Sequence, residues 1–104
     1  MSVQFLDTVV RVAAYLDTGF SGVLSLPPDL VSADLPRDGE TQWILADDRE
    51  VRSPYVMGLL AIPEVGLRLS AAITLIGTVP IAGRQLSDRL RITLDHGREL
   101  IIEP

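Results

Sequence analysis

The segment AAYLDTGFSG, residues 13–22, is where an apolar run stops at a single carboxylate. Residues 3–16 lead into it and carry a cluster of β-branched side chains, so they are predicted to form a strand. A helix is the alternative, since several apolar positions of this stretch also fit a 3.6-residue period. Gly19 and Gly22 then indicate a tight loop, because glycine adopts positive φ without steric cost. The segment therefore predicts a strand followed directly by a loop that carries Asp17.

The composition favours one small domain built largely from strands. The chain has 104 residues, enough for a single core but not for two. Hydrophobic residues make up 47% and aromatic residues only 5%, so Val, Leu, Ile and Ala must fill the core. Such a core suits strands at least as well as helices. We expect one domain, residues 1–104, of the all-β class with one or two short helices.

Charge and missing residue types exclude several classes of function. The net charge is −5 and no stretch concentrates basic residues, which argues against a nucleic-acid partner. The absence of Cys excludes disulfides and thiolate chemistry, and one histidine, His96, cannot make a multi-histidine metal site in one chain. No stretch reads as a signal peptide or a bilayer-spanning segment. We expect no membrane partner and a cytoplasmic location.

The remaining chain alternates short apolar runs with turn residues. Residues 23–26 are predicted to form a strand that ends at Pro27-Pro28, followed by a short helix. Pro54 marks the second arm of the next hairpin as an edge or a bulge, because proline cannot donate to a ladder. The other predicted elements are a hairpin of residues 41–45 and 50–61 around a turn at 46–49, a strand at 66–76, a short helix at 84–90, and a hairpin of residues 91–94 and 99–102 around 95–98.

The triplet Asp17-Thr18-Gly19 has a chemical interpretation. In aspartic peptidases two carboxylates face each other and share a proton, so one activates water while the other polarises the scissile carbonyl. The threonine hydroxyl can bond to backbone across the site, and the glycine lets substrate approach the main chain. The structural alternative is an Asp that only caps a loop between two strands.

Two motifs, in order, resemble the small prokaryotic members of the retropepsin-like aspartic proteases. Residues 16–22 (LDTGFSG) and 24–28 (LSLPP) are similar to the strand of that family that runs into Asp-Thr-Gly-Phe and then Leu-x-Leu-Pro. Residues 81–84 (IAGR) resemble the segment that precedes the C-terminal helix of the family, and residues 90–104 resemble its closing strand. The resemblance covers nearly the whole chain. It implies a closed acid-protease-like β-barrel.

The resemblance also implies roles for individual residues. Asp17 would be the catalytic carboxylate, Thr18 and Gly19 would support the catalytic loop, and the hairpin of residues 41–58 would be the flap that closes over substrate. No metal or other cofactor is required. The implied substrate-binding residues are Gly19, Ser21, Ala46, Asp47, Asp48, Val79 and Ile81.

The chain departs from the retroviral pattern at two places. Ser21 stands where the retroviral enzymes usually carry an Asp that pairs with the Arg of the second motif, here Arg84. The flap tip carries Asp47-Asp48 in place of a glycine-rich sequence. We expect Arg84 to serve as a structural ion pair or at a helix end, Trp43 to pack in the core or the flap, and His96 to lie in a solvated turn.

The number of Asp-Thr-Gly triplets fixes the expected assembly. The mechanism needs two carboxylates and the chain has one such triplet, so a peptidase of this kind must be a homodimer with its site on the two-fold axis. The apolar strand at residues 100–102 is expected to form the dimer interface together with the N-terminal strand. The leading hypothesis is a homodimeric aspartic endopeptidase acting on peptide or protein substrates. The alternatives are a non-catalytic peptide-binding or dimerisation module on the same fold, and an unrelated β-rich module.

Overall fold

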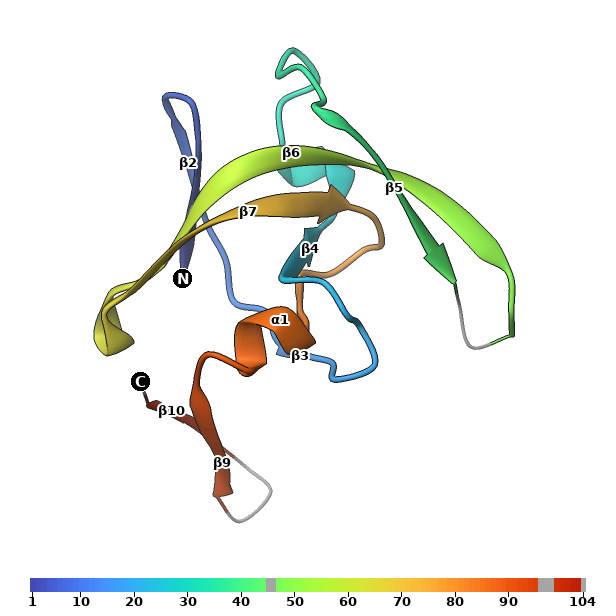
Figure 1. Cartoon of the computed structure of the whole chain (residues 1–104). Helices are drawn as coiled ribbons and strands as arrows, with labels where there is room; N and C mark the ends of the chain where they lie inside the picture. Colours follow the sequence, from blue (N-terminus) through green and yellow to red (C-terminus); the bar gives the residue numbers. More distant parts are fainter. Residues whose placement is uncertain (45–46, 96–98, 104) are drawn as a thin grey trace.

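The structure is a computed structural model that describes residues 1–44, 47–95 and 99–103, and these form a mostly β molecule (Figure 1). Two short 3-10 turns, η1 Pro28–Leu30 and η2 Pro63–Val65, and one helix, α1 Arg84–Ser87, interrupt the strands. No helix in these ranges has the length and hydrophobicity needed to cross a bilayer. The strands are β1 Ser2–Phe5, β2 Thr8–Arg11, β3 Tyr15–Leu16, β4 Leu24–Leu26, β5 Gly39–Ile44, β6 Glu50–Ile62, β7 Leu67–Leu75, β8 Ile81–Ala82, β9 Arg91–Asp95 and β10 Glu99–Glu103.

One curled sheet carries eight of the strands. Its order is β2-β1-β6-β7-β4-β8-β3, and β5 pairs with β6 beside this path. The sheet bends into a half-barrel, with β6 and β7 arching over the shorter strands (Figure 1). β4 runs parallel to β7 and antiparallel to β8, and β3 runs parallel to β8. The predicted all-β class is confirmed at this level.

A three-residue connection joins the two ends of the sheet path. β2 and β3 lie at opposite ends of the path, yet only residues 12–14 separate them in the chain. Val12 N donates to Met1 O at 3.0 Å, which continues the pairing of β1 with β2. Tyr15 N donates to Pro80 O at 3.0 Å, which starts the pairing of β3 with β8. The chain therefore bends from one edge of the sheet directly to the other.

The core is aliphatic and lies inside the curl of the sheet. Its most deeply buried side chains come from β1, β4, β6, β7 and α1, so strands distant in sequence share one core. Leu60 is 0% exposed, whereas Met57 on the same strand is 49% exposed. This alternation along β6 is that of a strand with one buried face. The fully buried large side chains are Val3, Phe5, Leu24, Leu26, Leu60, Ile73 and Leu86.

The prediction of a single strand over residues 3–16 is wrong. The chain turns back at Leu6 and Asp7, and β1 pairs with β2 with Phe5 opposite Thr8. Leu6 takes a positive φ of 52°, which is uncommon for a residue with a branched side chain. The turn lacks the Gly, Asn and Pro that usually mark such a position. A prediction from strand propensity therefore continues through it.

Both predicted hairpins are present. β5 pairs with β6 from Gly39 opposite Tyr55 to Ile44 opposite Glu50, and Asp48 in the connection has a φ of 63°. β6 also pairs with β7, beginning at Tyr55, so Pro54 lies just outside that ladder. β9 and β10 form a separate two-stranded sheet. His96 and the two residues that follow it in the predicted turn lie outside the described residues.

The helix predicted at residues 84–90 is shorter than expected. α1 ends at Ser87, and the following turn bonds Leu90 N to Ser87 O at 3.0 Å. Leu86 is the buried residue of this helix.

Truncation of Leu60 tests the assignment of the core. Leu60→Ala is expected to lower the free energy of unfolding by about 2–5 kcal/mol, because it removes a fully buried side chain from between β1 and β7. Urea denaturation followed by circular dichroism measures this. Met57→Ala is the matched control on the same strand and is expected to cost less than about 1 kcal/mol, because Met57 faces outward. Equal losses from both variants would contradict the described burial.

Candidate active site

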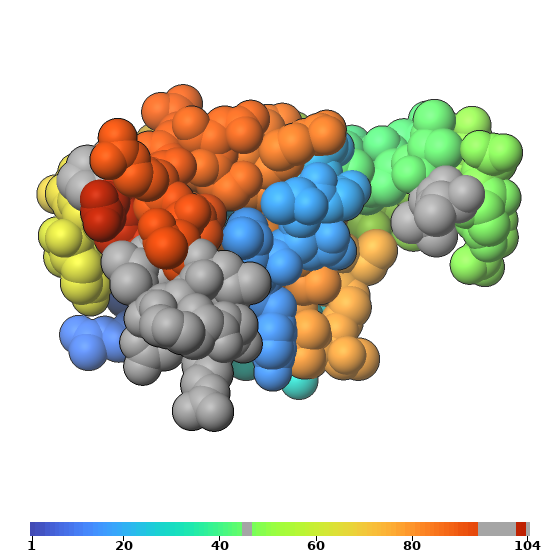
Figure 2. Space-filling model, turned by 90° about the horizontal axis from the view of Figure 1, so that it is seen from below, coloured from blue at the N-terminus to red at the C-terminus, as the bar shows by residue number. Residues whose placement is uncertain are grey.

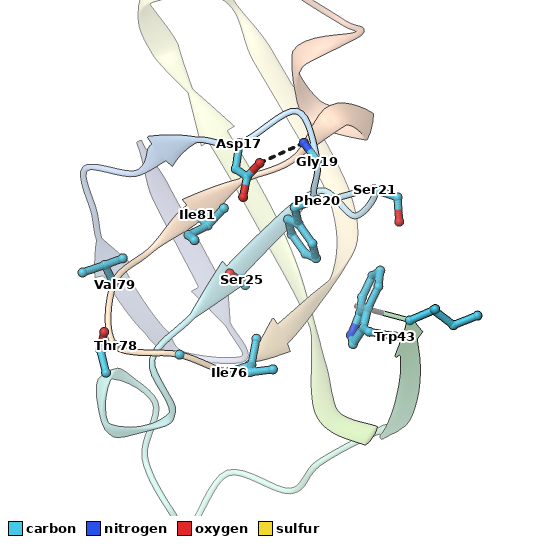
Figure 3. A pocket seen from close by; sticks show the side chains of 12 residues that line it. Asp17, Gly19, Phe20, Ser21, Ser25, Trp43, Ile76, Thr78, Val79 and Ile81 are labelled. Atoms are coloured by element: carbon cyan, nitrogen blue, oxygen red, sulfur yellow. Dashed lines mark hydrogen bonds between the residues drawn. The ribbon is translucent and has the colours of Figure 1, made fainter. Parts of the chain in front are cut away.

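Asp17 lies directly after β3 and is held in place by backbone hydrogen bonds. β3 pairs with β8 through Leu16 and Ala82, and Asp17 N donates to Ala82 O at 2.9 Å. Gly19 N donates to Asp17 Oδ1 at 2.8 Å, an Asx turn that fixes the carboxylate. Asp17 is exposed, and its second oxygen points into a pocket (Figure 3).

The loop after Asp17 rests on the segment that starts α1. Gly83 N donates to Val23 O at 2.9 Å, Arg84 N to Phe20 O at 2.8 Å, and Gln85 N to Gly22 O at 3.2 Å. The first N–H groups of a helix have no partners within the helix, and here the carbonyls of the loop accept from them. The two sequence motifs, residues 16–22 and 81–84, are therefore packed against each other.

Gly83 is required by the closeness of this contact. A Cβ atom at position 83 would lie 2.2 Å from Gly22 O and 2.7 Å from Phe20 O. Both of these atoms belong to backbone that already accepts hydrogen bonds from α1, so they cannot move aside easily. Only glycine fits between α1 and the Asp17 loop.

The pocket beside Asp17 has a volume of about 460 Å³ and is walled mainly by apolar side chains (Figure 3). Its polar side chains are Asp17, Ser21, Ser25 and Thr78. A pocket of this size with few polar groups is typical of a site that buries the apolar part of a ligand and orients the ligand's polar groups by a small number of hydrogen bonds. The lining residues are Asp17, Gly19, Phe20, Ser21, Ser25, Trp43, Ile44, Ile76, Gly77, Thr78, Val79 and Ile81.

The β5–β6 hairpin contributes one side of the pocket. It projects beyond the rest of the molecule (Figure 2). Trp43 and Ile44 of β5 reach the pocket, and the ring of Trp43 packs on Phe20 with centroids 5.0 Å apart and planes tilted by 55°. This aromatic pair connects the hairpin to the loop that carries Asp17.

The structure brings together some of the predicted site residues and leaves others apart. Gly19, Ser21, Val79 and Ile81 line the pocket with Asp17. Thr18 is exposed and is not among the lining residues. Asp47 and Asp48 are exposed in the hairpin turn and do not line the pocket either; Asp47 forms a salt bridge with Arg49. Ala46 lies outside the described residues.

Several lining residues were not predicted from sequence. Trp43 alternates with its exposed neighbours Gln42 and Ile44 along β5, and that alternation was the available signal for a side of the hairpin turned inward. Ile44 is itself 72% exposed and gave no such signal. Ile76, Gly77 and Thr78 precede the predicted Val79, so reading the whole loop as a unit would have found them. Phe20 is part of the first motif. Ser25 is buried within β4 and gave no signal.

In the described part of the chain, Arg84 forms no ion pair and the acidic residues form no metal-binding cluster. The Arg84 side chain is exposed and makes no ion pair with a described residue. Within the same ranges no three carboxylate or imidazole side chains converge as metal ligands would.

Comparisons with known proteins leave the family open. Neither a scan against protein-family models nor searches among curated proteins and solved structures finds a match to this chain.

Substitution of Gly83 tests the contact between the two motifs. Gly83→Ala is expected to destabilise the fold by about 1–3 kcal/mol or more, because the added methyl group forces α1 away from the Asp17 loop. Thermal unfolding measures the loss. Gln85→Ala, an exposed position on the same helix, is the control and is expected to change stability by less than about 0.5 kcal/mol. Unchanged unfolding of Gly83→Ala would show that the loop and α1 are not in this contact.

Proposed function

We propose that this protein is a homodimeric aspartic endopeptidase that hydrolyses peptide bonds in peptide or protein substrates. The observation that carries the proposal is the placement of Asp17. Its carboxylate is fixed by the Gly19 amide at 2.8 Å, and its second oxygen faces an apolar pocket of about 460 Å³. A carboxylate oriented in this way at the edge of a pocket is suited to general acid–base chemistry.

In the proposed reaction two Asp17 carboxylates, one from each subunit, share one proton. The ionised carboxylate takes a proton from water, and the oxygen of that water attacks the carbonyl carbon of the scissile peptide. The protonated carboxylate donates to the carbonyl oxygen as charge develops there. Transfer of a proton to the leaving nitrogen then breaks the C–N bond and yields an acid and an amine. The apolar lining of the pocket holds a side chain beside the scissile bond.

The proposal includes an acid-protease-like fold in which the curled sheet closes as a barrel. The feature that supports closure is the connection of residues 12–14, which carries the chain from one end of the sheet path to the other. The β5–β6 hairpin, which reaches the pocket through Trp43 and Ile44, would be the flap.

Exposed groups on the single chain support the homodimer. Asp17 and Thr18 are both exposed, although the mechanism needs them beside a second copy. The β9–β10 hairpin is a two-stranded sheet of its own, and such hairpins are marginally stable in isolation. Ile102 on β10 is 40% exposed and, with Ile92 and Leu90, borders a small apolar cavity of about 60 Å³. Pairing with the hairpin of a second copy would cover this surface.

A second candidate function is a peptide-binding module that does not cut. The observation that favours it is the bond from Gly19 N to Asp17 Oδ1, because this bond gives the carboxylate a structural role in the loop. Turnover distinguishes the two functions.

Asp17→Asn tests catalysis without disturbing the loop, because the amide oxygen of Asn can accept the same bond from Gly19. Cleavage of unfolded β-casein at acid and at neutral pH is expected to fall by at least about 10²-fold. Asp29→Asn, at an exposed position on η1, is the control and should cleave as wild type does. Equal cleavage by wild type and Asp17→Asn would refute the assignment, and peptide binding without cleavage by either would favour the second candidate.

Ile102→Asp tests the dimer. A carboxylate buried in an apolar interface without a partner is costly, so we expect the dimer dissociation constant to rise at least about tenfold. Analytical ultracentrifugation over a concentration series measures this. Leu30→Asp is the matched control, since Leu30 is 42% exposed on η1 and away from β10. A wild-type chain that stays monomeric at all concentrations would rule out the shared site.

A further inference from the structure

The indole N–H of Trp43 has no hydrogen-bond acceptor among the described residues. Its indole Nε1 is buried, and no described residue accepts a hydrogen bond from it. Buried polar groups in proteins are nearly always paired, and an unpaired one is costly. Among the side chains of the described residues this nitrogen is the one buried donor or acceptor in that condition.

The ring is held in one orientation by the Asp17 loop. Trp43 packs on Phe20 with ring centroids 5.0 Å apart. The far end of its six-membered ring, Cη2, lies 3.1 Å from where a Cβ on Gly22 would be, so glycine makes room for it. The nitrogen is at the other end of the indole, and that end is turned toward the inside of the pocket that Asp17 lines (Figure 3).

We infer that Trp43 Nε1–H donates a hydrogen bond to a backbone carbonyl of a peptide bound in the Asp17 pocket. Trp43 is then a residue that positions the ligand. The inference rests on the proposed function, since it assigns a contact to the ligand of that same site.

The chemistry of the pocket selects a neutral acceptor. Asp17 lines the same pocket, so an anionic acceptor such as a carboxylate would be repelled by it. A peptide carbonyl carries no net charge and recurs at every residue of an extended chain. β5 pairs with β6 along one edge only within the described residues, so the other edge is available to an extended peptide beside Trp43.

The contact would also fix the hairpin over the ligand. Trp43 belongs to β5 and rests on Phe20 of the Asp17 loop. A peptide bonded to Nε1 therefore ties the hairpin to the loop through the ligand itself.

The test uses the full-length chain in the Asp17→Asn background, with tryptic peptides of β-casein as the probe. The chain has one Trp, so the indole gives one N–H resonance in a nitrogen-15 spectrum. We expect this resonance to move downfield on saturation, and Trp43→Phe to bind the peptides about 3- to 10-fold more weakly. Replacement of Trp43 by 3-benzothienylalanine keeps the shape of the ring without the N–H and should weaken binding to the same extent.

Stability measurements separate this role from packing. Removal of an unpaired buried donor is not expected to destabilise the fold, so the benzothienylalanine variant should unfold at or above the wild-type temperature. A lower unfolding temperature with unchanged binding would overturn the inference in favour of a purely structural Trp43.

The Gly19 amide resonance distinguishes failure of the inference from failure of the proposed function. Movement of Gly19 without movement of the indole would mean that peptides occupy the pocket without Trp43, which overturns the inference and leaves the proposed function standing. If neither resonance moves and wild type does not cleave the peptides, both proposals fall.

Discussion

The set of backbone hydrogen bonds between the Asp17 loop and the start of α1 is the constraint on which the site depends. Asp17 N donates to Ala82 O, and Gly83 N, Arg84 N and Gln85 N donate to carbonyls of residues 20–23. These bonds satisfy helix N–H groups and loop carbonyls at once, so neither segment can move without leaving backbone groups unpaired. The carboxylate keeps its orientation because its loop is part of a network that includes the helix.

The packing of Phe20 on Trp43 is a second constraint on the site. Phe20 extends from the loop toward the β5–β6 hairpin and packs on Trp43. This contact between two rings fixes the hairpin relative to the loop that carries Asp17. The two glycines nearest this contact, Gly22 and Gly83, both face Phe20 at distances that leave no room for a side chain. The two glycines thus fix the position of the Phe20 ring, which lines the pocket together with Trp43. Its chemistry follows from this arrangement, with one carboxylate at the edge and aliphatic walls from residues 76–81.

The sequence predicted the class of fold and the two hairpins better than it predicted local geometry. Apolar runs separated by turn residues were enough to identify the β5–β6 and β9–β10 hairpins, because alternation and turn chemistry are local signals. The turn at Leu6 was not predicted, since a leucine at positive φ contradicts propensity; the β1–β2 ladder on either side and the bond from Gln4 Nε2 to Leu6 O hold it. Only part of the site was predicted, because only some of its residues belong to local sequence motifs. Asp17, Gly19 and Ile81 belong to the two motifs and Val79 lies two residues before the second, whereas Trp43 and Ile44 come from the β5–β6 hairpin, which reaches the pocket only in the folded chain.

β6 is a strand of thirteen residues with two different surroundings along its length. From Tyr55 to Ile62 it is paired with β7 and contributes Leu60 to the core, and from Glu50 to Pro54 it pairs with β5 alone. The half that pairs with β7 is held in the core, and the other half carries the projecting hairpin (Figure 2). Because β6 runs unbroken from Glu50 to Ile62, one continuous strand joins the hairpin to the core. The position of the hairpin is therefore set at two points, by the half of β6 that is anchored in the core and by the contact of Trp43 with Phe20.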